Sequence, residues 1–354
     1  MIRVLVVDDS AVMRAMLRAQ LARASDIEVV AEAADPYEAR EAILRFAPDV
    51  ITLDIDMPRM DGLSFLARLM RHHPLPVVVI SSLTPANSDA ALRALSLGAV
   101  EVIAKPHSAQ AATALRAELL SALRAAACAK VGHQPSDAAV IAAAQPSSDS
   151  FDTSMPAMIA IGASTGGPAT IERVLMGMPA NVPPIVIVQH MLAGFTAAFA
   201  RRLDGCCALR VKEARDGEPA EAGTAYIAPS GQHMLVLGQQ GKLRIAVRAG
   251  PPVQNHRPSV DVLFHSVAKA VGPDAVGVLL TGMGADGASG MCALRSAGAR
   301  TIAQDETTSV VFSMPAEAIR SGGAGQVLPL DRIAPAILKP LRAHRSNSVV
   351  VNNT

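Results

Sequence analysis

From residue 2 to about residue 127, short apolar runs alternate with longer segments whose apolar residues recur every three or four positions. The short runs predict buried β-strands, and the longer segments predict amphipathic helices. Their regular alternation is typical of βαβ units, which build a parallel sheet with helices on its faces. We therefore expect five helices and five strands in this half, the strands at residues 2–7, 28–31, 50–53, 77–80 and 100–103.

Cap residues mark where these helices begin and end. Ser10 can cap the first helix, and Asp35 with Pro36 can open the second, because proline is favoured in the first helical turn. Gly98 stands where the fourth helix should end. The caps fall between the predicted strands, as the βαβ interpretation requires.

The same alternation resumes after residue 157, with buried strand candidates at residues 158–161, 184–188, 276–280 and 301–303. These runs predict a second α/β domain, doubly wound and mostly parallel. Residues 233–237 and 243–247 flank a glycine-containing turn and predict an inserted β-hairpin. Residues 126–156 have the Gly, Pro, Ser and Ala content of a linker. We expect domains over residues 1–125 and 157–345, joined by this linker, and a flexible tail over residues 346–354.

Length, charge and cysteine content narrow the class of protein. The chain has 354 residues, enough for two domains with separate cores. Its 32 Lys and Arg nearly balance 31 Asp and Glu, and aromatic residues make up 3%, so we expect no nucleic-acid partner. No apolar run reaches about 18 residues, which predicts a cytoplasmic protein without membrane insertion. Because the four cysteines fit neither a disulfide framework nor a metal site, we expect them to be reduced and mostly packing residues.

Polar side chains gather at the ends of the predicted strands in the first half. Asp8 and Asp9 follow the first strand, and Asp54, Ser81 and Lys105 end the third, fourth and fifth. All lie at the carboxyl edge of one parallel sheet, where open α/β folds bind ligands. Crowded carboxylates require a cation, and their oxygen atoms suit Mg²⁺. Any one of these residues could merely cap a helix, but the set favours phosphoryl transfer to a carboxylate, with Lys105 and Ser81 supporting the phosphate.

These residues stand in motifs that resemble a response-regulator receiver domain: Val6-Val7-Asp8-Asp9-Ser10, Leu53-Asp54-Ile55-Asp56-Met57-Pro58, Asp61-Gly62, Ser81 and Lys105-Pro106. The resemblance implies a flavodoxin-like fold with Asp54 as the phosphoacceptor. It also implies that Asp9, Asp54 and the backbone carbonyl of Asp56 bind Mg²⁺, with Asp8 acting directly or through water. Val102 departs from the pattern, since many receivers have an aromatic residue there that reports the switch.

A glycine-rich turn opens the second domain. Gly162-Ala163-Ser164-Thr165-Gly166 follows an apolar strand and precedes a helix predicted to begin near Pro168. It matches Gly-x-Ser-x-Gly, in which a sharp turn exposes a serine hydroxyl at the edge of a sheet. Backbone N–H groups at the helix start, including that of Thr165, could stabilise an oxyanion. The same kind of turn also binds phosphate or simply reverses the chain, so the motif alone leaves catalysis open.

A nucleophilic serine needs a general base, and His190 is the leading candidate. It follows the strand at residues 184–188 and so lies at the sheet edge that carries Ser164. His233 and His256 are rivals, although the adjacent Arg257 would disfavour protonation of His256.

The base needs a carboxylate to orient it, and Asp286 follows the strand at residues 276–280 in a glycine-rich loop. Asp286 could equally be the N-cap of the next helix. In the same loop, the N–H of Met283 could be an oxyanion donor. The chain order Ser164, His190, Asp286 differs from the serine, acid, histidine order of α/β-hydrolases, but such triads arise on unrelated folds.

From residue 157 to about residue 340 the chain resembles the catalytic domain of the chemotaxis protein-glutamate methylesterase. The matching segments are residues 161–167, 189–191, 226–229, 256–261, 281–287 and 302–305. A receiver fused to this domain, in this order, is more specific than either half. The resemblance implies that Ser164, His190 and Asp286 hydrolyse glutamyl methyl esters on chemoreceptors, release methanol, and also deamidate receptor glutamines for chemotactic adaptation.

The resemblance also implies partners and regulation. The substrates would be methyl-accepting chemotaxis receptors and the phosphodonor a histidine kinase of the CheA type. Mg²⁺ would serve receiver phosphorylation, and hydrolysis would need no cofactor. The unphosphorylated receiver would cover the serine, and phosphorylation of Asp54 would favour an open arrangement. The residues alone leave two alternatives: a receiver-controlled serine hydrolase of another ester or peptide, and a phospho-switched binding module without catalysis.

Overall fold

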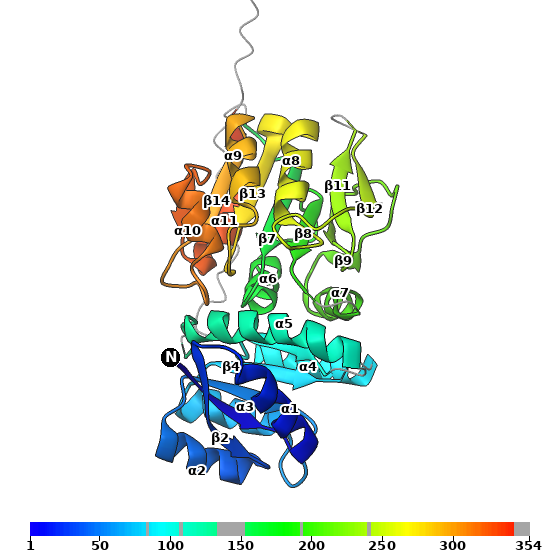
Figure 1. The fold of residues 1–354 in the computed structure, drawn as a ribbon. Helices are drawn as coiled ribbons and strands as arrows, with labels where there is room; N and C mark the ends of the chain where they lie inside the picture. The colour runs from blue at the N-terminus through cyan, green and yellow to red at the C-terminus, as the bar shows by residue number, and fades with distance from the viewer. Residues whose placement is uncertain (83–84, 106–108, 133–152, 192–193, 239–241, 343–354) are drawn as a thin grey trace, which may run out of the picture.

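The computed structural model describes residues 1–82, 85–105, 109–132, 153–191, 194–238 and 242–342. Its first domain is a parallel sheet in the order β2-β1-β3-β4-β5, with helices on both faces (Figure 1). The five predicted strands and five predicted helices are confirmed. The strands are β1 (Ile2–Val7), β2 (Ile27–Ala33), β3 (Val50–Asp54), β4 (Val77–Ser81) and β5 (Glu101–Ala104). The helices are α1 (Ala11–Leu21), α2 (Pro36–Phe46), α3 (Gly62–His72), α4 (Pro85–Ser96) and α5 (Ala109–Ala127).

The predicted caps are confirmed. The Ser10 hydroxyl accepts a hydrogen bond from the Met13 N–H at the start of α1. The Asp35 carboxylate accepts from two N–H groups at the start of α2, with Pro36 as the first helical residue. Gly98 follows α4 with φ +106°, a left-handed conformation that favours glycine.

The second domain is built on a parallel sheet in the order β15-β14-β13-β7-β8-β10-β9. Its strands are β7 (Met158–Ala163), β8 (Ile185–Gln189), β9 (Arg210–Glu213), β10 (Thr224–Ile227), β13 (Ala275–Leu279), β14 (Arg300–Gln304) and β15 (Gln326–Leu328). The four predicted strands form its centre, whereas β9, β10 and β15 were not predicted. The predicted hairpin, β11 (His233–Leu237) with β12 (Arg244–Arg248), is antiparallel and forms a two-stranded sheet of its own beside the parallel one.

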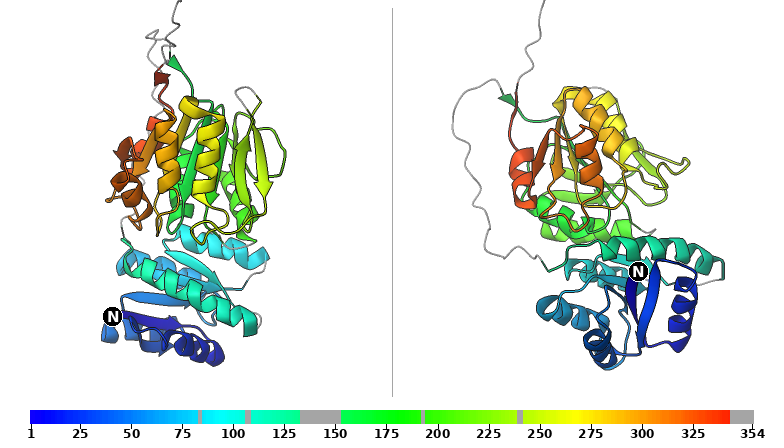
Figure 2. Two further views of the ribbon diagram at one scale, coloured as in Figure 1. Left: turned by 45° about the horizontal axis from the view of Figure 1, so that its top comes forward. Right: turned by 60° about the vertical axis from the view of Figure 1, so that its left-hand side comes forward.

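Helices cover both faces of this sheet (Figures 1 and 2). They are α6 (Gly167–Met176), α7 (Phe195–Cys206), α8 (Val260–Ala270), α9 (Ala288–Ser296), α10 (Met314–Arg320) and α11 (Leu330–Ile337), with a 3-10 turn at Gly272–Asp274. Most of the predicted linker and all of the predicted tail lie outside the described residues. Within the linker range, α5 continues to Ala127, and β6 (Thr153–Ser154) pairs with β16 (Leu341–Arg342).

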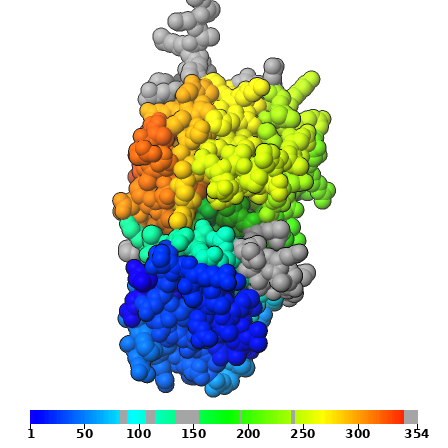
Figure 3. Space-filling model, in the orientation of Figure 1, coloured from blue at the N-terminus to red at the C-terminus, as the bar shows by residue number. Residues whose placement is uncertain are grey.

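The two domains are in contact: α4 of the first packs against α6 and α7 of the second, and α5 lines the cleft that holds Ser164 (Figures 1 and 2). A continuous apolar cluster includes Leu95 of α4 and Phe199 of α7. The main-chain N–H of Lys130 donates to the carbonyl of Val310 at 2.9 Å, and its ammonium lies 3.0 Å from Glu306. The space-filling view shows the domains abutting with α5 between them (Figure 3). This docking places the first domain beside the sheet edge that carries Ser164.

Among the described residues, no helix is long and apolar enough to cross a bilayer. All four cysteines are free, and Cys207 packs partly against an apolar cluster. The prediction of packing residues was wrong for Cys128 and Cys206, which are exposed. Cys206 is the last residue of α7 and Cys128 directly follows α5, so both occupy helix ends at the surface.

Candidate active site

Ser164 lies at the turn between β7 and α6, directly after the central strand of the second sheet. Its N–H donates to the carbonyl of Thr281 at 3.0 Å, and its carbonyl accepts from the Gln189 amide at 2.9 Å. The glycines around it are required by close packing. A Cβ on Gly282 would lie 2.7 Å from the Ser164 Cβ, and one on Gly167 would lie 1.9 Å from the Gln189 Oε1. The turn is therefore held tightly, with the Ser164 side chain at the edge of the sheet.

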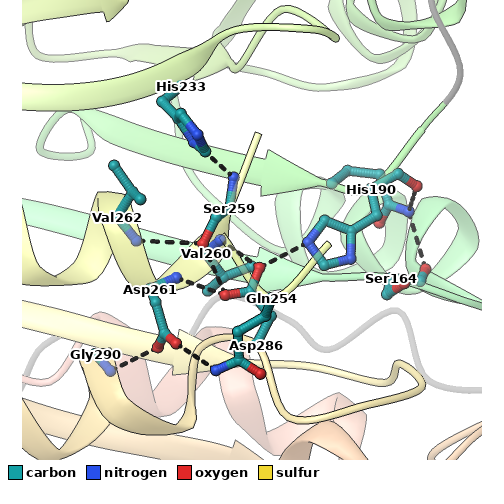
Figure 4. Close-up of polar contacts among 11 residues, drawn as sticks. Ser164, His190, His233, Gln254, Ser259, Val260, Asp261, Val262, Asp286 and Gly290 are labelled. Carbon is teal, nitrogen blue, oxygen red and sulfur yellow. Dashed lines mark hydrogen bonds and ion pairs between the residues drawn. The ribbon is translucent and has the colours of Figure 1, made fainter. Parts of the chain in front are cut away.

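His190 follows β8 and is bonded to Asp286. Its Nε2 lies 2.9 Å from the Asp286 Oδ2, and both side chains are largely buried. A carboxylate can only accept, so Nε2 carries the proton of this hydrogen bond and a neutral His190 keeps its lone pair on Nδ1. Nδ1 is buried, has no partner among the described residues, and lies on the side of the ring that faces Ser164 (Figure 4).

No hydrogen bond between the Ser164 hydroxyl and His190 is present among the described residues, although both side chains line one cleft. In enzymes without substrate, such catalytic hydrogen bonds are often long and tighten only when the substrate binds. The sheet edge thus brings together all three residues predicted for the site, with the histidine between the serine and the aspartate (Figure 4).

Asp286 also closes the N-terminus of α8, a contact that the sequence did not reveal. Its Oδ1 accepts from the Ser259 hydroxyl at 2.8 Å and from the Asp261 N–H at 3.0 Å, and its Oδ2 accepts from the Val260 N–H at 2.7 Å. Burial acts to raise the pKa of Asp286, but His190 and these N–H donors outweigh it and hold the pKa below its usual value. The alternative that Asp286 caps the helix following it was wrong, since Gly287 occupies that position without a side-chain bond.

The two rival histidines, His233 and His256, make other contacts. His233 is buried, and its Nδ1 accepts from the Ser259 N–H at 3.2 Å while its Nε2 lies 2.9 Å from the carbonyl of Pro251. His233 therefore supports the start of α8. The ring of His256 stacks on the ring of His190, with centroids 3.7 Å apart and planes inclined by 5°. Sequence reasoning weighed His256 only as a competing base and missed this contact.

A cleft of about 700 Å³ connects these residues, with walls from both domains. Met283 and Thr165, whose N–H groups were predicted as oxyanion donors, line it beside Ser164. Glu101 of β5 and Glu118 of α5 line it from the first domain. Thr165 directly follows Ser164 in the chain, and its hydroxyl donates to the Glu101 carboxylate at 3.0 Å. Burial raises the pKa of Glu101 to about 7.

The acidic cluster predicted in the first domain lies at the carboxyl edge of its sheet. Asp8 and Asp54 are buried and Asp9 is exposed, and each offers a carboxylate oxygen within 4.8 Å of the others. The Lys105 ammonium lies 2.7 Å from Asp54 and 3.2 Å from Asp8. Burial raises the pKa of Asp54 even though Lys105 opposes it. The hydroxyl of Ser81 is buried without a hydrogen-bond partner among the described residues.

This cluster fits a hard divalent cation. Its side-chain donors are all carboxylate oxygens, the ligands that Mg²⁺ prefers in proteins. Asp56, whose carbonyl was predicted as a further ligand, follows Asp54 closely, and its N–H donates to the Asp54 Oδ1 at 3.3 Å. Val102, at the position where an aromatic residue is common, is buried in the apolar core.

Both halves match known families. Residues 159–337 match the model of the CheB methylesterase, and residues 4–116 match that of the response regulator receiver domain. The protein-glutamate methylesterase/protein-glutamine glutaminase 5 of Anaeromyxobacter dehalogenans is 51% identical over 351 residues, covering 96% of this chain and 97% of the relative. The protein-glutamate methylesterase/protein-glutamine glutaminase of Salmonella typhimurium is 49% identical over 345 residues, covering 97% of each.

A solved structure supports the same assignment. The crystal structure of the Thermotoga maritima CheB methylesterase catalytic domain matches with a TM-score of 0.51 and 39% identity, covering 52% of this chain and 98% of that one. A receiver domain followed by such a domain is the organisation of a response regulator with an enzymatic output domain. The chain belongs to the CheB methylesterase family.

Proposed function

We propose that this protein is a phosphorylation-activated methylesterase that hydrolyses glutamyl methyl esters on chemoreceptors and deamidates receptor glutamines. The observation that carries the proposal is the pairing of His190 with Asp286 at a sheet edge that also carries Ser164. The names of the relatives support both activities. The product carboxylate shifts the receptor's signalling equilibrium, so the output is adaptation. We assign the enzyme to the cytoplasm.

The arrangement supports a serine-hydrolase mechanism. Ser164 attacks the γ-carbonyl of the ester while His190 Nδ1 takes its proton, and Asp286 stabilises the imidazolium through Nε2. The N–H groups of Met283 and Thr165 donate to the oxyanion. His190 then delivers its proton to the leaving methoxide, which departs as methanol. Water, deprotonated by His190, releases glutamate from the acyl enzyme and restores Ser164. With a glutamine side chain, the same route releases ammonia.

The acidic cluster of the first domain fits phosphorylation. The Asp54 carboxylate is the nucleophile toward the phosphoryl group, Lys105 balances its charge, and the Ser81 hydroxyl can donate to a phosphate oxygen. Asp8, Asp9, Asp54 and the carbonyl of Asp56 would hold Mg²⁺, which neutralises the developing charge on the phosphate. A CheA-type histidine kinase is the phosphodonor that we propose.

The docking of the domains supports regulation by access. A receptor helix with its side chains is about 10–12 Å wide, and one wall of the cleft belongs to α5 of the receiver. We infer that the receiver, which forms this wall, moves away before such a helix reaches Ser164. Phosphorylation of Asp54 would favour the opened arrangement by changing the receiver face that contacts α6 and α7.

The experiment that tests the function is methanol release from a methylated chemoreceptor. The full-length protein should release methanol slowly alone and faster with acetyl phosphate and Mg²⁺. Small esters and unmethylated receptor serve as substrate controls. Hydrolysis of small esters with no methanol from the receptor would leave a serine hydrolase of another specificity.

Asp54→Asn should remove the stimulation by acetyl phosphate and Mg²⁺ and keep the basal rate, because the amide is not a phosphoacceptor. The matched control is Glu41→Gln, which makes the same kind of charge change on the exposed face of α2. It should respond like the unmodified protein. Methanol release with and without phosphodonor gives both values, and stimulation that survives in Asp54→Asn would place the switch elsewhere.

Docking should weaken as the pH rises, because Glu101 is hydrogen-bonded to Thr165 in the docked interface and its pKa is raised there. Docked Glu101 keeps its proton up to about pH 7, whereas an exposed glutamate loses it near pH 4.5. Between about pH 4.5 and pH 7 the docked form therefore binds more protons than the undocked form. The free energy that favours docking falls as the pH rises through this range and stays at the lower level above it. Glu118 lines the same cleft, and burial raises its pKa too.

Glu101→Gln tests this, since it keeps an acceptor for the Thr165 hydroxyl and cannot ionise. The ratio of the basal methanol release of the unmodified protein to that of Glu101→Gln cancels the pH dependence of the chemistry. We expect a ratio near one at pH 5 and a several-fold higher ratio at pH 8. A ratio that does not change with pH would contradict the role of Glu101 in docking.

A further inference from the structure

His256 lines the cleft and has no role in the proposed mechanism. Its ring lies flat on that of His190, with centroids 3.7 Å apart and planes inclined by only 5°. The second contact that restrains the His190 ring is the hydrogen bond from its Nε2 to Asp286. One contact fixes an edge of the His190 ring, and the other fixes its plane.

His256 is held in place by a tight turn. The main chains of Val253 and His256 exchange two hydrogen bonds, of 3.0 and 2.9 Å. Gln254 and Asn255 between them have φ of +49° and +67°, as in a type I′ turn. The Gln254 amide donates to the Asp261 carboxylate at 2.9 Å (Figure 4), and this ties the turn to α8.

The residue after His256 is anchored as well. The Arg257 guanidinium donates to the carbonyl of Gly250 at 2.6 Å, and the Arg257 carbonyl accepts from the Gly231 N–H at 3.1 Å. The His256 ring is thus positioned by backbone and side-chain contacts on both sides of it. A ring held this firmly can restrict the ring that it covers.

The charge on His256 matters, because a second imidazolium would repel a protonated His190. Burial, followed by the neighbouring His190, lowers the pKa of His256 to about 4. Asp286 opposes this shift, and Glu101 and Glu118 line the same cleft from the receiver. At neutral pH His256 therefore presents an uncharged aromatic face, which is compatible with the transient positive charge on His190.

We propose that His256 is a positioning residue for the esterase reaction: its flat ring holds the plane of His190 so that Nε2 stays on Asp286 while Nδ1 faces Ser164. It donates and accepts no proton in the reaction. The inference rests on the proposed function, because it assigns His256 a role through the proposed base. Losing the flat contact would let the His190 ring turn about its side-chain bonds, and small misplacements of a catalytic group cost up to about 100-fold in rate.

Two substitutions of similar bulk distinguish three possible roles of His256: a flat stacking surface, a filler of space, and an imidazole that takes part in the chemistry. His256→Phe keeps a flat aromatic face, whereas His256→Leu fills the space without one. His265→Ala is the control, since His265 is exposed on α8 and its Nε2 is hydrogen-bonded to the Ser289 hydroxyl at 3.1 Å, not to His190 or His256. All are assayed as full-length protein with acetyl phosphate and Mg²⁺, after circular dichroism has shown that they are folded.

We expect kcat for methanol release to fall about 10- to 100-fold in His256→Leu with KM changed less than about threefold. In His256→Phe and His265→Ala, kcat should stay within about threefold of the unmodified value. A loss in His256→Phe equal to that in His256→Leu would overturn the proposal, because imidazole chemistry would then be required. So would an unchanged kcat in His256→Leu.

A second measurement does not depend on turnover. In protein labelled with ¹⁵N-histidine, the Nε2–H of His190 that donates to Asp286 should give a slowly exchanging downfield proton resonance, assigned by its loss in His190→Gln. The resonance should persist in His256→Phe and broaden or vanish in His256→Leu. A resonance unchanged in His256→Leu would refute the positioning role, whether or not the protein hydrolyses receptor esters. Failure of the unmodified protein to hydrolyse receptor esters would instead refute the proposed function.

Discussion

Ser164→Ala should reduce methanol release from methylated receptor by about 10⁴-fold or more, because no covalent acyl intermediate can form without the hydroxyl. What remains should come from the oxyanion donors and substrate positioning alone. Phosphorylation of Asp54 by acetyl phosphate should be unaffected, since it occurs in the other domain. The measurement is methanol release together with a phosphorylation assay on the same preparation.

The variant should stay folded, because the contacts that hold Ser164 are made by its main chain. A serine-directed fluorophosphonate should label the unmodified protein and not Ser164→Ala. Ser289→Ala is the matched control, since Ser289 is exposed on α9 and should leave labelling and activity unchanged. Full esterase activity in Ser164→Ala would refute the triad, and absence of labelling in the unmodified protein would favour a binding module.

Asp286→Asn should lower kcat by about 10³- to 10⁴-fold, as loss of charge does in other triads. The two carboxylate oxygens of Asp286 accept four hydrogen bonds in all, one from His190 and three from residues 259–261. An asparagine has only one such oxygen, and its NH₂ group must face a donor. Where the NH₂ meets His190, the imidazole proton moves to Nδ1, and the ring can no longer take the proton of Ser164.

The same variant should also be less stable. A buried N–H that loses its acceptor costs about 1–3 kcal/mol. Because the pKa of Asp286 lies below its usual value in the folded protein, its ionised form stabilises the fold above about pH 4, and that contribution is lost as the pH falls through the folded pKa. Thermal unfolding should therefore separate Asp286→Asn from the unmodified protein at pH 7 and less so in strong acid. Equal melting temperatures at pH 7 would contradict the capping role.

Much of the fold could be predicted because the central strands are buried on both faces. Runs such as residues 158–161 and 276–280 are almost wholly apolar, and the residues at their ends must then meet at one edge. That logic located Ser164, His190 and Asp286 in one region, as it located Asp54 and Lys105. Three strands were missed: β9 and β15 are short, lie at the edges of the sheet and include exposed residues, and β10 is only four residues long.

The contacts that the sequence did not reveal depend on backbone conformation and tertiary packing, which the pattern of apolar and polar residues does not specify. The stack of His256 on His190 depends on a turn with two positive φ angles at Gln254 and Asn255, neither of which is a glycine that would have signalled it. The closure of α8 by Asp286 joins residues that are 25 to 27 positions apart and lie on different elements. Periodicity and strand-end reasoning contain neither piece of information.

The double duty of Asp286 has a consequence for how relatives of this protein diverge. A descendant that gives up hydrolysis can lose Ser164, because its hydroxyl makes no hydrogen bond among the described residues and its main chain holds the turn. It must keep an acceptor at position 286 to retain the start of α8. An aspartate there is thus a poor marker of activity in an uncharacterised homologue. The serine is the position at which pseudoenzymes and working enzymes should part.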